Sequence, residues 1–244
     1  MRRAAPRANS PKARLREGQS SEPEGESVPT RVDGEGVPVT ANAAGPRPLA
    51  RVCLFCGANV GARAGYAHAA RAFGATLARE GLALVYGGGS VGLMNEAAEA
   101  ALAGGGRVVG VITEELMSRE VGHAGLTEMH VVATMHERKA LMASLSDAFV
   151  ALPGGYGTFD ELCEMLTWDQ LGIHDKPVVV VNVDGFFDGF LAQLDRAVED
   201  RMLKPENRAM LAVVREVGDA LPAARAWCPP EVASKWYRDP VPRP

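Results

Sequence analysis

From Leu49 onward the chain alternates short, continuously apolar runs with longer segments in which apolar residues recur at helical spacing. The short runs predict strands at 52–56, 82–86, 107–112, 128–132, 148–152 and 177–183. The longer segments predict helices at 66–80, 91–103, 135–146, 158–171 and 186–201. This alternation is typical of an α/β fold with a doubly wound parallel sheet and helices on both faces. Ligands of such sheets bind beyond the carboxyl ends of the strands, so the loops after the strands are the place to look for chemistry.

Residues 1–49 have a different composition. They contain seven of the 16 prolines and no aromatic residue, and the first 16 positions carry six Lys or Arg and no acid. Such a segment buries too little apolar surface to offset its chain entropy. We therefore expect a disordered tail at 1–49, a single domain at 50–226 and a C-terminal tail at 227–244. A basic arm that touches nucleic acid, or an organelle-targeting peptide, is the alternative for the first segment.

The overall charge of −4 gives no indication of binding to nucleic acid or to an acidic membrane surface. No run approaches the ~18 consecutive apolar residues of a membrane span, and the chain does not start with an apolar signal segment. These features predict a soluble, cytoplasmic protein. Cys53 and Cys56 form a C-x-x-C, but a spacing of three along a strand points the two thiols to opposite faces. Two core cysteines are therefore expected rather than a redox pair, and we expect neither a metal nor a cofactor.

Two glycine-rich loops follow predicted strands. The first, G-G-G-S-V-G at 87–92, fits G-x-G-x-x-G and opens a helix, whose free N–H groups and partial positive charge suit an anion. A dinucleotide site with Glu114 on the ribose is a further interpretation. Two features weaken it: the preceding strand is not the first of the domain, and a second loop of this type exists.

The second loop is P-G-G-Y-G-T at 153–158, again between a strand and a helix. Thr158 is a plausible N-cap, and Glu161 follows three residues later as in a capping box. In the functional alternative, this loop and the first lie side by side, one holding a phosphate and the other approaching a sugar. Neither loop ends in G-K-[ST], which argues against hydrolysis of a nucleoside triphosphate.

Arg138 falls within the apolar stripe of its predicted helix. A buried guanidinium is costly unless an anion pairs with it. An internal salt bridge or a side chain that reaches water would satisfy it, and so would a phosphate or a catalytic carboxylate at the strand ends. On the other helix, Glu161 lies beside the second glycine loop and outside the main core face, Glu164 lies one turn on, and Asp160 is expected to be solvated.

These segments resemble the motifs of one family. Residues 153–161 match P-G-G-x-G-T-x-x-E, residues 135–139 resemble M-H-x-R-K, and residues 87–94 resemble G-G-G-x-x-G-L-M. Together with 168–172 and 176–177, they resemble the LOG family of cytokinin riboside 5′-monophosphate phosphoribohydrolases, many of which were once labelled lysine decarboxylases. The resemblance covers about residues 50–205 in the expected order.

The resemblance implies a Rossmann-like single domain that works as a homodimer or an assembly of dimers. It implies a catalytic pair, Arg138 and Glu161, and a nucleoside 5′-monophosphate substrate. The expected substrate contacts are Glu120, Lys139, Gly88, Gly89, Gly155, Tyr156, Gly157, Thr158 and Thr167. The chain departs from the family where Ala58 and Asn59 replace the two serines of C-G-S-S and where Asn95 replaces a glycine, which leaves the base preference open.

The expected reaction is hydrolysis of the N-glycosidic bond of an N6-substituted adenosine 5′-monophosphate. Cleavage of a ribose C–N bond has a transition state like an oxocarbenium ion, which a carboxylate stabilises while it activates water. We expect Glu161 to fill this role, with Arg138 orienting it and keeping it ionised. The main alternative is a nucleotide- or cofactor-binding protein without turnover. A pyridoxal enzyme would need a Schiff-base lysine, and Lys139 and Lys176 lie in no such motif; an NAD-dependent oxidoreductase is a further alternative.

Overall fold

The computed structural model describes residues 47–120 and 122–230, apart from the side chain of Glu120. Most of the predicted tails, at 1–49 and 227–244, lies outside these residues. At the C-terminal end, Trp227 is buried and its indole N–H donates to the carbonyl of Met210 at 3.2 Å. The packed structure therefore includes Trp227, one residue past the predicted domain, whose bounds of 50–226 stay a prediction.

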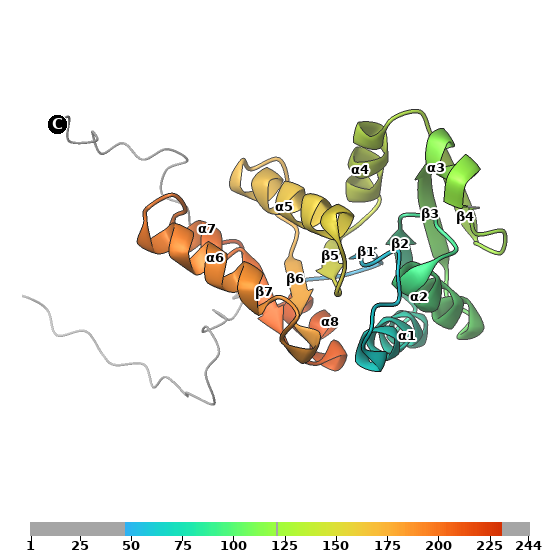
Figure 1. Cartoon of the computed structure of the whole chain (residues 1–244), viewed down its shortest axis with the longest axis horizontal. Coiled ribbons are helices and arrows are strands. Elements are labelled where there is room, and N and C mark those ends of the chain that lie inside the picture. Colours follow the sequence, from blue (N-terminus) through green and yellow to red (C-terminus); the bar gives the residue numbers. More distant parts are fainter. Residues whose placement is uncertain (1–46, 121, 231–244) are drawn as a thin grey trace, which may run out of the picture. The chain divides into compact units, whose positions relative to one another are not determined.

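Seven parallel strands form one sheet in the order β4-β3-β2-β1-β5-β6-β7 (Figure 1). The strands are β1 (Arg51–Phe55), β2 (Ala83–Tyr86), β3 (Val108–Thr113), β4 (Glu128–Val132), β5 (Ala148–Ala151), β6 (Val178–Val181) and β7 (Leu211–Val214). The chain starts in the middle with β1, runs outward to β4, and then returns to place β5 on the other side of β1. This reversal opens a crevice at the carboxyl ends of β1 and β5, where ligands of doubly wound sheets bind.

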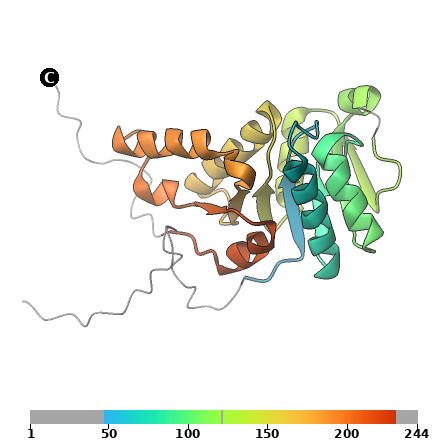
Figure 2. The same ribbon diagram turned by 60° about the horizontal axis from the view of Figure 1, so that its bottom comes forward.

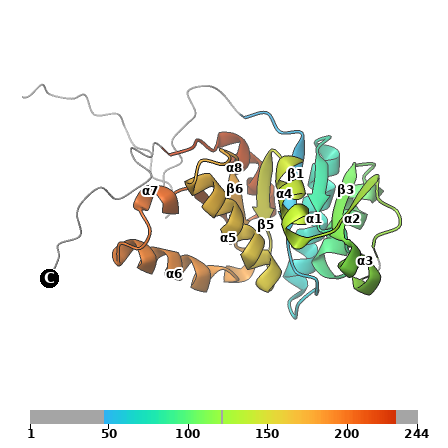
Figure 3. The same cartoon turned by 90° about the horizontal axis from the view of Figure 1, so that it is seen from above.

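Helices cover both faces of the sheet. They are α1 (Ala64–Arg79), α2 (Gly92–Ala103), α3 (Glu114–Glu120), α4 (Met135–Ser144), α5 (Tyr156–Gln170), α6 (Asp188–Glu199), α7 (Pro205–Arg208) and α8 (Ala220–Ala226), with short 3₁₀ turns η1 (Val183–Gly185) and η2 (Val217–Asp219). Figure 1 shows α4, α5 and α6 on one side of the sheet and α1, α2 and α8 on the other. In Figure 2, α1 and α2 lie side by side, and in Figure 3 the same is seen for α4 and α5. The α/β fold with a Rossmann-like parallel sheet is confirmed.

Successive strand residues supply two separate apolar cores. One core, against α1 and α2, contains Val52 and Leu54 of β1 and Cys56 just after it. The other core, against α4 and α5, contains Cys53 and Phe55. The two thiols therefore point to opposite faces, as the spacing predicts, and both are free. With both faces covered, the strands read as continuously apolar runs.

The predicted strands and helices are present, with ends that differ by a few residues. Besides the two 3₁₀ turns, three α-helices and one strand were missed: α3, α7, α8 and β7. Each has only four to seven residues. Such segments are too short for an apolar period to be read, so packing on the sheet decides their structure.

Gly92 fixes the loop after β1 against the start of α2. Its φ is +61°, and a Cβ there would overlap the backbone of Ala58 and Asn59. The neighbouring amide of Leu93 donates to the carbonyl of Gly57 at 2.9 Å. Only glycine accepts this backbone conformation at so close a contact.

We predict that Gly92→Ala lowers the free energy of unfolding by roughly 2 kcal/mol more than Gly105→Ala. Gly105 is a matched control, because its φ is +74° but a Cβ there would meet open space. Urea unfolding of both variants measures the difference. Equal losses would show that the contact with the β1 loop contributes nothing beyond the dihedral strain.

Candidate active site

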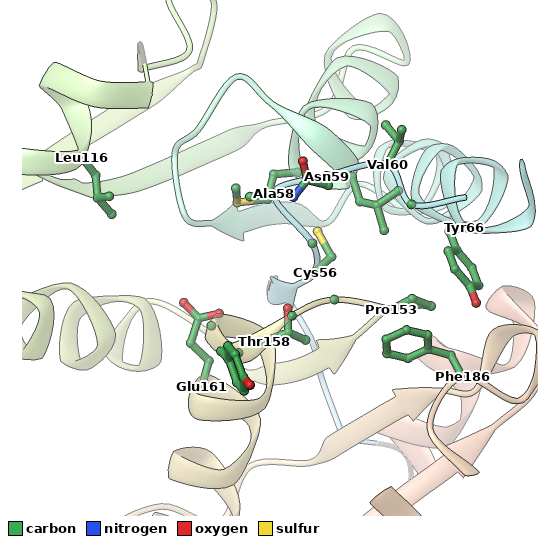
Figure 4. Close-up of a pocket in the computed structure, with 18 of the residues that line it drawn as sticks. Cys56, Ala58, Asn59, Val60, Tyr66, Leu116, Pro153, Thr158, Glu161 and Phe186 are labelled. Carbon is green, nitrogen blue, oxygen red and sulfur yellow. The ribbon is translucent and has the colours of Figure 1, made fainter. Parts of the chain in front are cut away.

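A cavity of about 480 Å³ lies at the carboxyl ends of the strands, where the topology predicts a site (Figure 4). The loops after β1 and β5 line it, together with residues of α1, α2, α3, α4 and α5 and Phe186, which follows η1. The lining residues are Cys56, Gly57, Ala58, Asn59, Val60, Gly61, Tyr66, Leu93, Met94, Leu116, Met135, Arg138, Pro153, Gly154, Gly155, Tyr156, Gly157, Thr158, Glu161 and Phe186.

Arg138 is held in place by contacts with β3, with the loop after β2 and with α5. The helix that carries it begins with a capping box between Thr134 and Glu137, which the T-x-x-E spacing at 134–137 indicates. The Arg138 side chain is buried; its Nε donates to the carbonyl of Val111 at 2.9 Å and its Nη2 to that of Gly87 at 3.3 Å. A Cβ at position 87 would collide with Nη2, so this glycine makes room for the guanidinium.

The counter-charge of Arg138 is Glu161. Their Nη1 and Oε1 atoms lie 3.2 Å apart, and the two side chains are only 10% and 13% exposed. The sequence left two alternatives for Arg138: an internal salt bridge, or a catalytic carboxylate at the strand ends. The ion pair with Glu161 is an internal salt bridge with a carboxylate at that place. Glu161 projects from α5 into the cavity, as Figure 4 shows.

Burial raises the pKa of Glu161 to about 7, although the charge of Arg138 opposes the rise. Arg138 thus favours the ionised carboxylate, as expected, but desolvation outweighs this attraction. A carboxylate with a pKa near neutrality is well matched to accept a proton at physiological pH.

The amino end of α5 offers the cavity an anion site. Gly155 is the N-cap and supplies no side-chain hydrogen bond. Phe159 donates the first helical bond, to the carbonyl of Gly155 at 3.2 Å. Within the described residues, the preceding amides of Tyr156, Gly157 and Thr158 have no partner. Three free N–H groups at the positive end of a 15-residue helix suit a phosphate.

Thr158 does not cap this helix, so the predicted capping box with Glu161 is wrong. Thr158 lies inside the first turn, is buried, and packs so tightly on Gly154 that a Cβ there would collide with its hydroxyl. The hydroxyl oxygen is buried against Gly154 and has no hydrogen-bond partner within the described residues, although Thr158 belongs to the cavity lining (Figure 4). Glu161 is therefore not engaged in a helix cap and projects its carboxylate into the cavity.

The two glycine loops are not adjacent, contrary to expectation. The loop after β1 lies between them: the amide of Gly57 donates to Pro153 at 3.0 Å, and its carbonyl accepts from Leu93 at 2.9 Å. Gly88 and Gly89 are outside the cavity lining; the carbonyl of Gly88 accepts from His123, and Gly89 forms a β-bridge with Gly122. The first loop therefore serves mainly packing and the placement of Arg138.

Lys139 and Thr167 also lie outside the cavity lining. The ammonium of Lys139 pairs with Asp160 at 3.0 Å and with Glu164 at 3.1 Å. Asp160, expected to be simply solvated, is 59% exposed but takes part in this pair. The hydroxyl of Thr167 donates to the carbonyl of Cys163 at 2.7 Å. The structure thus gathers Arg138, Glu161 and residues 155–158 around one cavity, and the side chain of Glu120 is not described.

Several cavity residues had no signal in the sequence. Tyr66 and Phe186 meet edge to face, with ring centroids 5.6 Å apart, at one end of the cavity. Leu116, on the missed helix α3, lies at the other end. Of the departures from the family motifs, Ala58 and Asn59 line the cavity.

Among the residues that the structure describes, no cluster of His, Cys, Asp or Glu is suited to hold a metal ion. In the same part of the chain, no helix has the length and apolar character needed to cross a membrane.

Known proteins resemble this chain in sequence and in fold. Residues 94–223 match the family model described as "Possible lysine decarboxylase". The chain is 50% identical over 179 residues to the probable cytokinin riboside 5′-monophosphate phosphoribohydrolase LOGL1 of Oryza sativa subsp. japonica, covering 73% of this chain and 80% of that protein. It is 48% identical over 161 residues to the cytokinin riboside 5′-monophosphate phosphoribohydrolase LOG1 of Arabidopsis thaliana, covering 66% and 76%.

Solved structures add evidence on the fold alone. The molybdenum cofactor carrier protein of Chlamydomonas reinhardtii superimposes with a TM-score of 0.54 at 22% identity, over 71% of this chain and 94% of that one. The molybdenum cofactor binding protein of Rippkaea orientalis gives 0.54 at 20% identity, over 71% and 93%. Sequence, motif order and fold agree, and the chain belongs to the LOG family of cytokinin riboside 5′-monophosphate phosphoribohydrolases.

Proposed function

We propose that this chain hydrolyses the N-glycosidic bond of an N6-substituted adenosine 5′-monophosphate and releases the free base and ribose 5-phosphate. The curated relatives at about half identity carry the name of this activity. The observation that carries the proposal is the Arg138–Glu161 pair, which faces a cavity beside the free amides of α5.

The 5′-phosphate binds the amino end of α5. The amides of Tyr156, Gly157 and Thr158 donate their N–H groups to it. Glu161 lies five residues beyond Tyr156, about 7 Å along the helix axis. A ribose between the two sites therefore brings its anomeric carbon to the carboxylate.

The chemistry follows from this placement. As the bond from C1′ to the base breaks, the base nitrogen keeps the electron pair and the sugar becomes an oxocarbenium-like cation, which the charge of Glu161 stabilises. Water adds its oxygen to C1′ and gives a proton to Glu161. The base takes up a proton, and Glu161 returns its own to solvent. Arg138 positions the carboxylate and does not take part in the proton transfer.

The family resemblance supports further proposals. The protein works in the cytoplasm as a homodimer or an assembly of dimers, and it binds AMP as well as substituted nucleotides. Substrate contacts by Gly88, Gly89, Glu120, Lys139 and Thr167 stay predictions of that resemblance.

Base release tests the proposal directly. Purified protein incubated with AMP or with an N6-prenylated AMP should yield free base and ribose 5-phosphate in equal amounts, measured by chromatography. A protein that only binds nucleotides would show heat of binding in calorimetry and no product from either compound. That result would refute the hydrolase proposal and favour a nucleotide-binding protein without turnover.

Glu161→Gln should lower kcat by about a thousandfold in a protein that still folds, with a lower melting temperature because the buried Arg138 loses its counter-charge. The amide retains the shape of the side chain but neither stabilises the cation nor accepts the proton. Asp160→Asn is a matched control on the same helix, outside the cavity lining, and should keep near-normal turnover at pH 8. Near-normal turnover of Glu161→Gln would remove this residue from the mechanism.

The pH profile should report the same group. Because the ionised form of Glu161 is active and burial raises its pKa to about 7, kcat/KM should rise with pH and level off above that value. Arg138 lowers this pKa, so in Arg138→Met the rise should move to higher pH, and the rate should fall. The substrate phosphate also titrates, at pH ~6, but its contribution is the same for both proteins. Profiles that coincide would contradict the coupling.

A further inference from the structure

A second ion cluster lies beside the Arg138–Glu161 pair, between α4 and α5, the two neighbouring helices of Figure 3. The Nζ of Lys139 lies 3.0 Å from Oδ2 of Asp160 and 3.1 Å from Oε2 of Glu164. Only 9% of the Lys139 side chain is exposed, about as little as the 10% of Arg138. Two successive residues of α4 thus direct buried cations at three acids of α5.

The spacing of the acids explains how α5 serves both cations. Asp160 and Glu164 are four residues apart, so their side chains lie next to each other on one face of the helix, where Lys139 binds both. Glu161 is turned by about 100° from Asp160 and reaches Arg138 instead. Among the described residues, three ion pairs connect α4 with α5, and Lys139 makes two of them. Lys139 therefore contributes to the placement of the helix that carries Glu161.

The cluster also acts on Glu161 electrostatically. Burial lowers the pKa of Lys139, but the hydrogen bonds and charges of Asp160 and Glu164 together outweigh burial and raise it above its ordinary value, so this lysine is charged. Burial is the largest cause of the raised pKa of Glu161. The cations of α4, Arg138 and Lys139, lower this pKa, whereas the two other acids of the cluster raise it. Lys139 thus compensates the acids next to Glu161.

Strand β1 adds no charge to this balance. The thiols of Cys53 and Cys56 are close enough to interact with Glu161, but burial raises the pKa of both, so both stay neutral at physiological pH. Within the described residues, the charged groups that act on Glu161 are therefore those of α4 and α5.

We propose that Lys139 is a positioning residue for Glu161: bound between the two flanking acids of α5, it holds that helix against α4 and offsets their charge. This role needs no contact between Lys139 and the nucleotide, and its effect on turnover rests on the proposed function. Without the lysine charge, Asp160 and Glu164 are left uncompensated, and Glu161 keeps its proton to a higher pH. The ionised, active form is then scarcer at neutral pH.

Carbon-13 NMR of labelled glutamate carboxyl groups measures the titration of Glu161 in the protein without nucleotide, and the loss of a signal in Glu161→Gln assigns it. In Lys139→Met the titration midpoint should rise by about one pH unit, the effect of one charge at close range in a partly screened site. In Glu164→Gln it should fall, because an acid that raises the pKa is removed. The double variant, and Lys139→Arg, which keeps the charge, should stay within about half a unit of the wild type.

Two controls separate the charge of Lys139 from a general loss of packing. Arg208→Met removes a cation from another interhelical pair, between α7 and α6, in which Arg208 and Asp195 lie 2.8 Å apart. Arg208 lies outside the cavity lining, and its loss should leave the Glu161 midpoint unchanged. Circular dichroism melting shows whether each variant folds, and Glu164→Gln carries the test if Lys139→Met does not. An unchanged midpoint in every folded variant of the cluster would overturn the proposal.

The pH profile of kcat/KM connects the inference to turnover. Its rise should move to higher pH in Lys139→Met and to lower pH in Glu164→Gln, in step with the NMR midpoints. If the wild type releases no base, the hydrolase proposal fails, whereas shifted midpoints still support the role of Lys139. If Lys139 acts only by binding the nucleotide, Lys139→Met weakens AMP binding in calorimetry but leaves the Glu161 midpoint in place, and the positioning role is overturned.

Discussion

The buried charge of Arg138 is the constraint on which the site depends. Removing a guanidinium from water costs several kcal/mol unless a counter-charge and hydrogen-bond acceptors compensate it. Here two backbone carbonyls, of Val111 and Gly87, and the carboxylate of Glu161 supply those partners. Because the partners come from β3, from the loop after β2 and from α5, satisfying this single charge fixes three parts of the fold relative to α4.

The same interaction prepares the chemistry. Glu161 is buried deeply enough that its pKa rises to about 7, and Arg138 prevents a larger rise. A fully solvated carboxylate would be a weaker base, and one buried without a cation would be protonated and neutral. The pair therefore holds a proton acceptor with a pKa near neutrality at a fixed place beside the anion site of α5.

The sequence predicted the fold class and most elements from periodicity, and the cost of a buried charge predicted that Arg138 needs a partner or a path to water. The carboxylate of Glu161 as that partner was implied by the family resemblance. It failed where packing overrides local pattern. Thr158 looks like an N-cap by residue type, but Gly155 takes that position and Thr158 is buried against Gly154. The sequence could not identify Leu116 as a cavity residue, because its helix of seven residues is too short to show an apolar period. The first glycine loop looked like a phosphate site, since nothing local shows that the β1 loop lies against its helix.

The central claim is geometric: a nucleotide held by its phosphate on α5 presents its anomeric carbon to Glu161. A crystal structure of the Glu161→Gln variant soaked with AMP tests it most directly. The account predicts the phosphate on the amides of Tyr156, Gly157 and Thr158, and C1′ within about 4 Å of the residue 161 side chain, directly or through one water. A phosphate bound elsewhere, or a ribose turned away from α5 toward Tyr66 and Phe186, would contradict it.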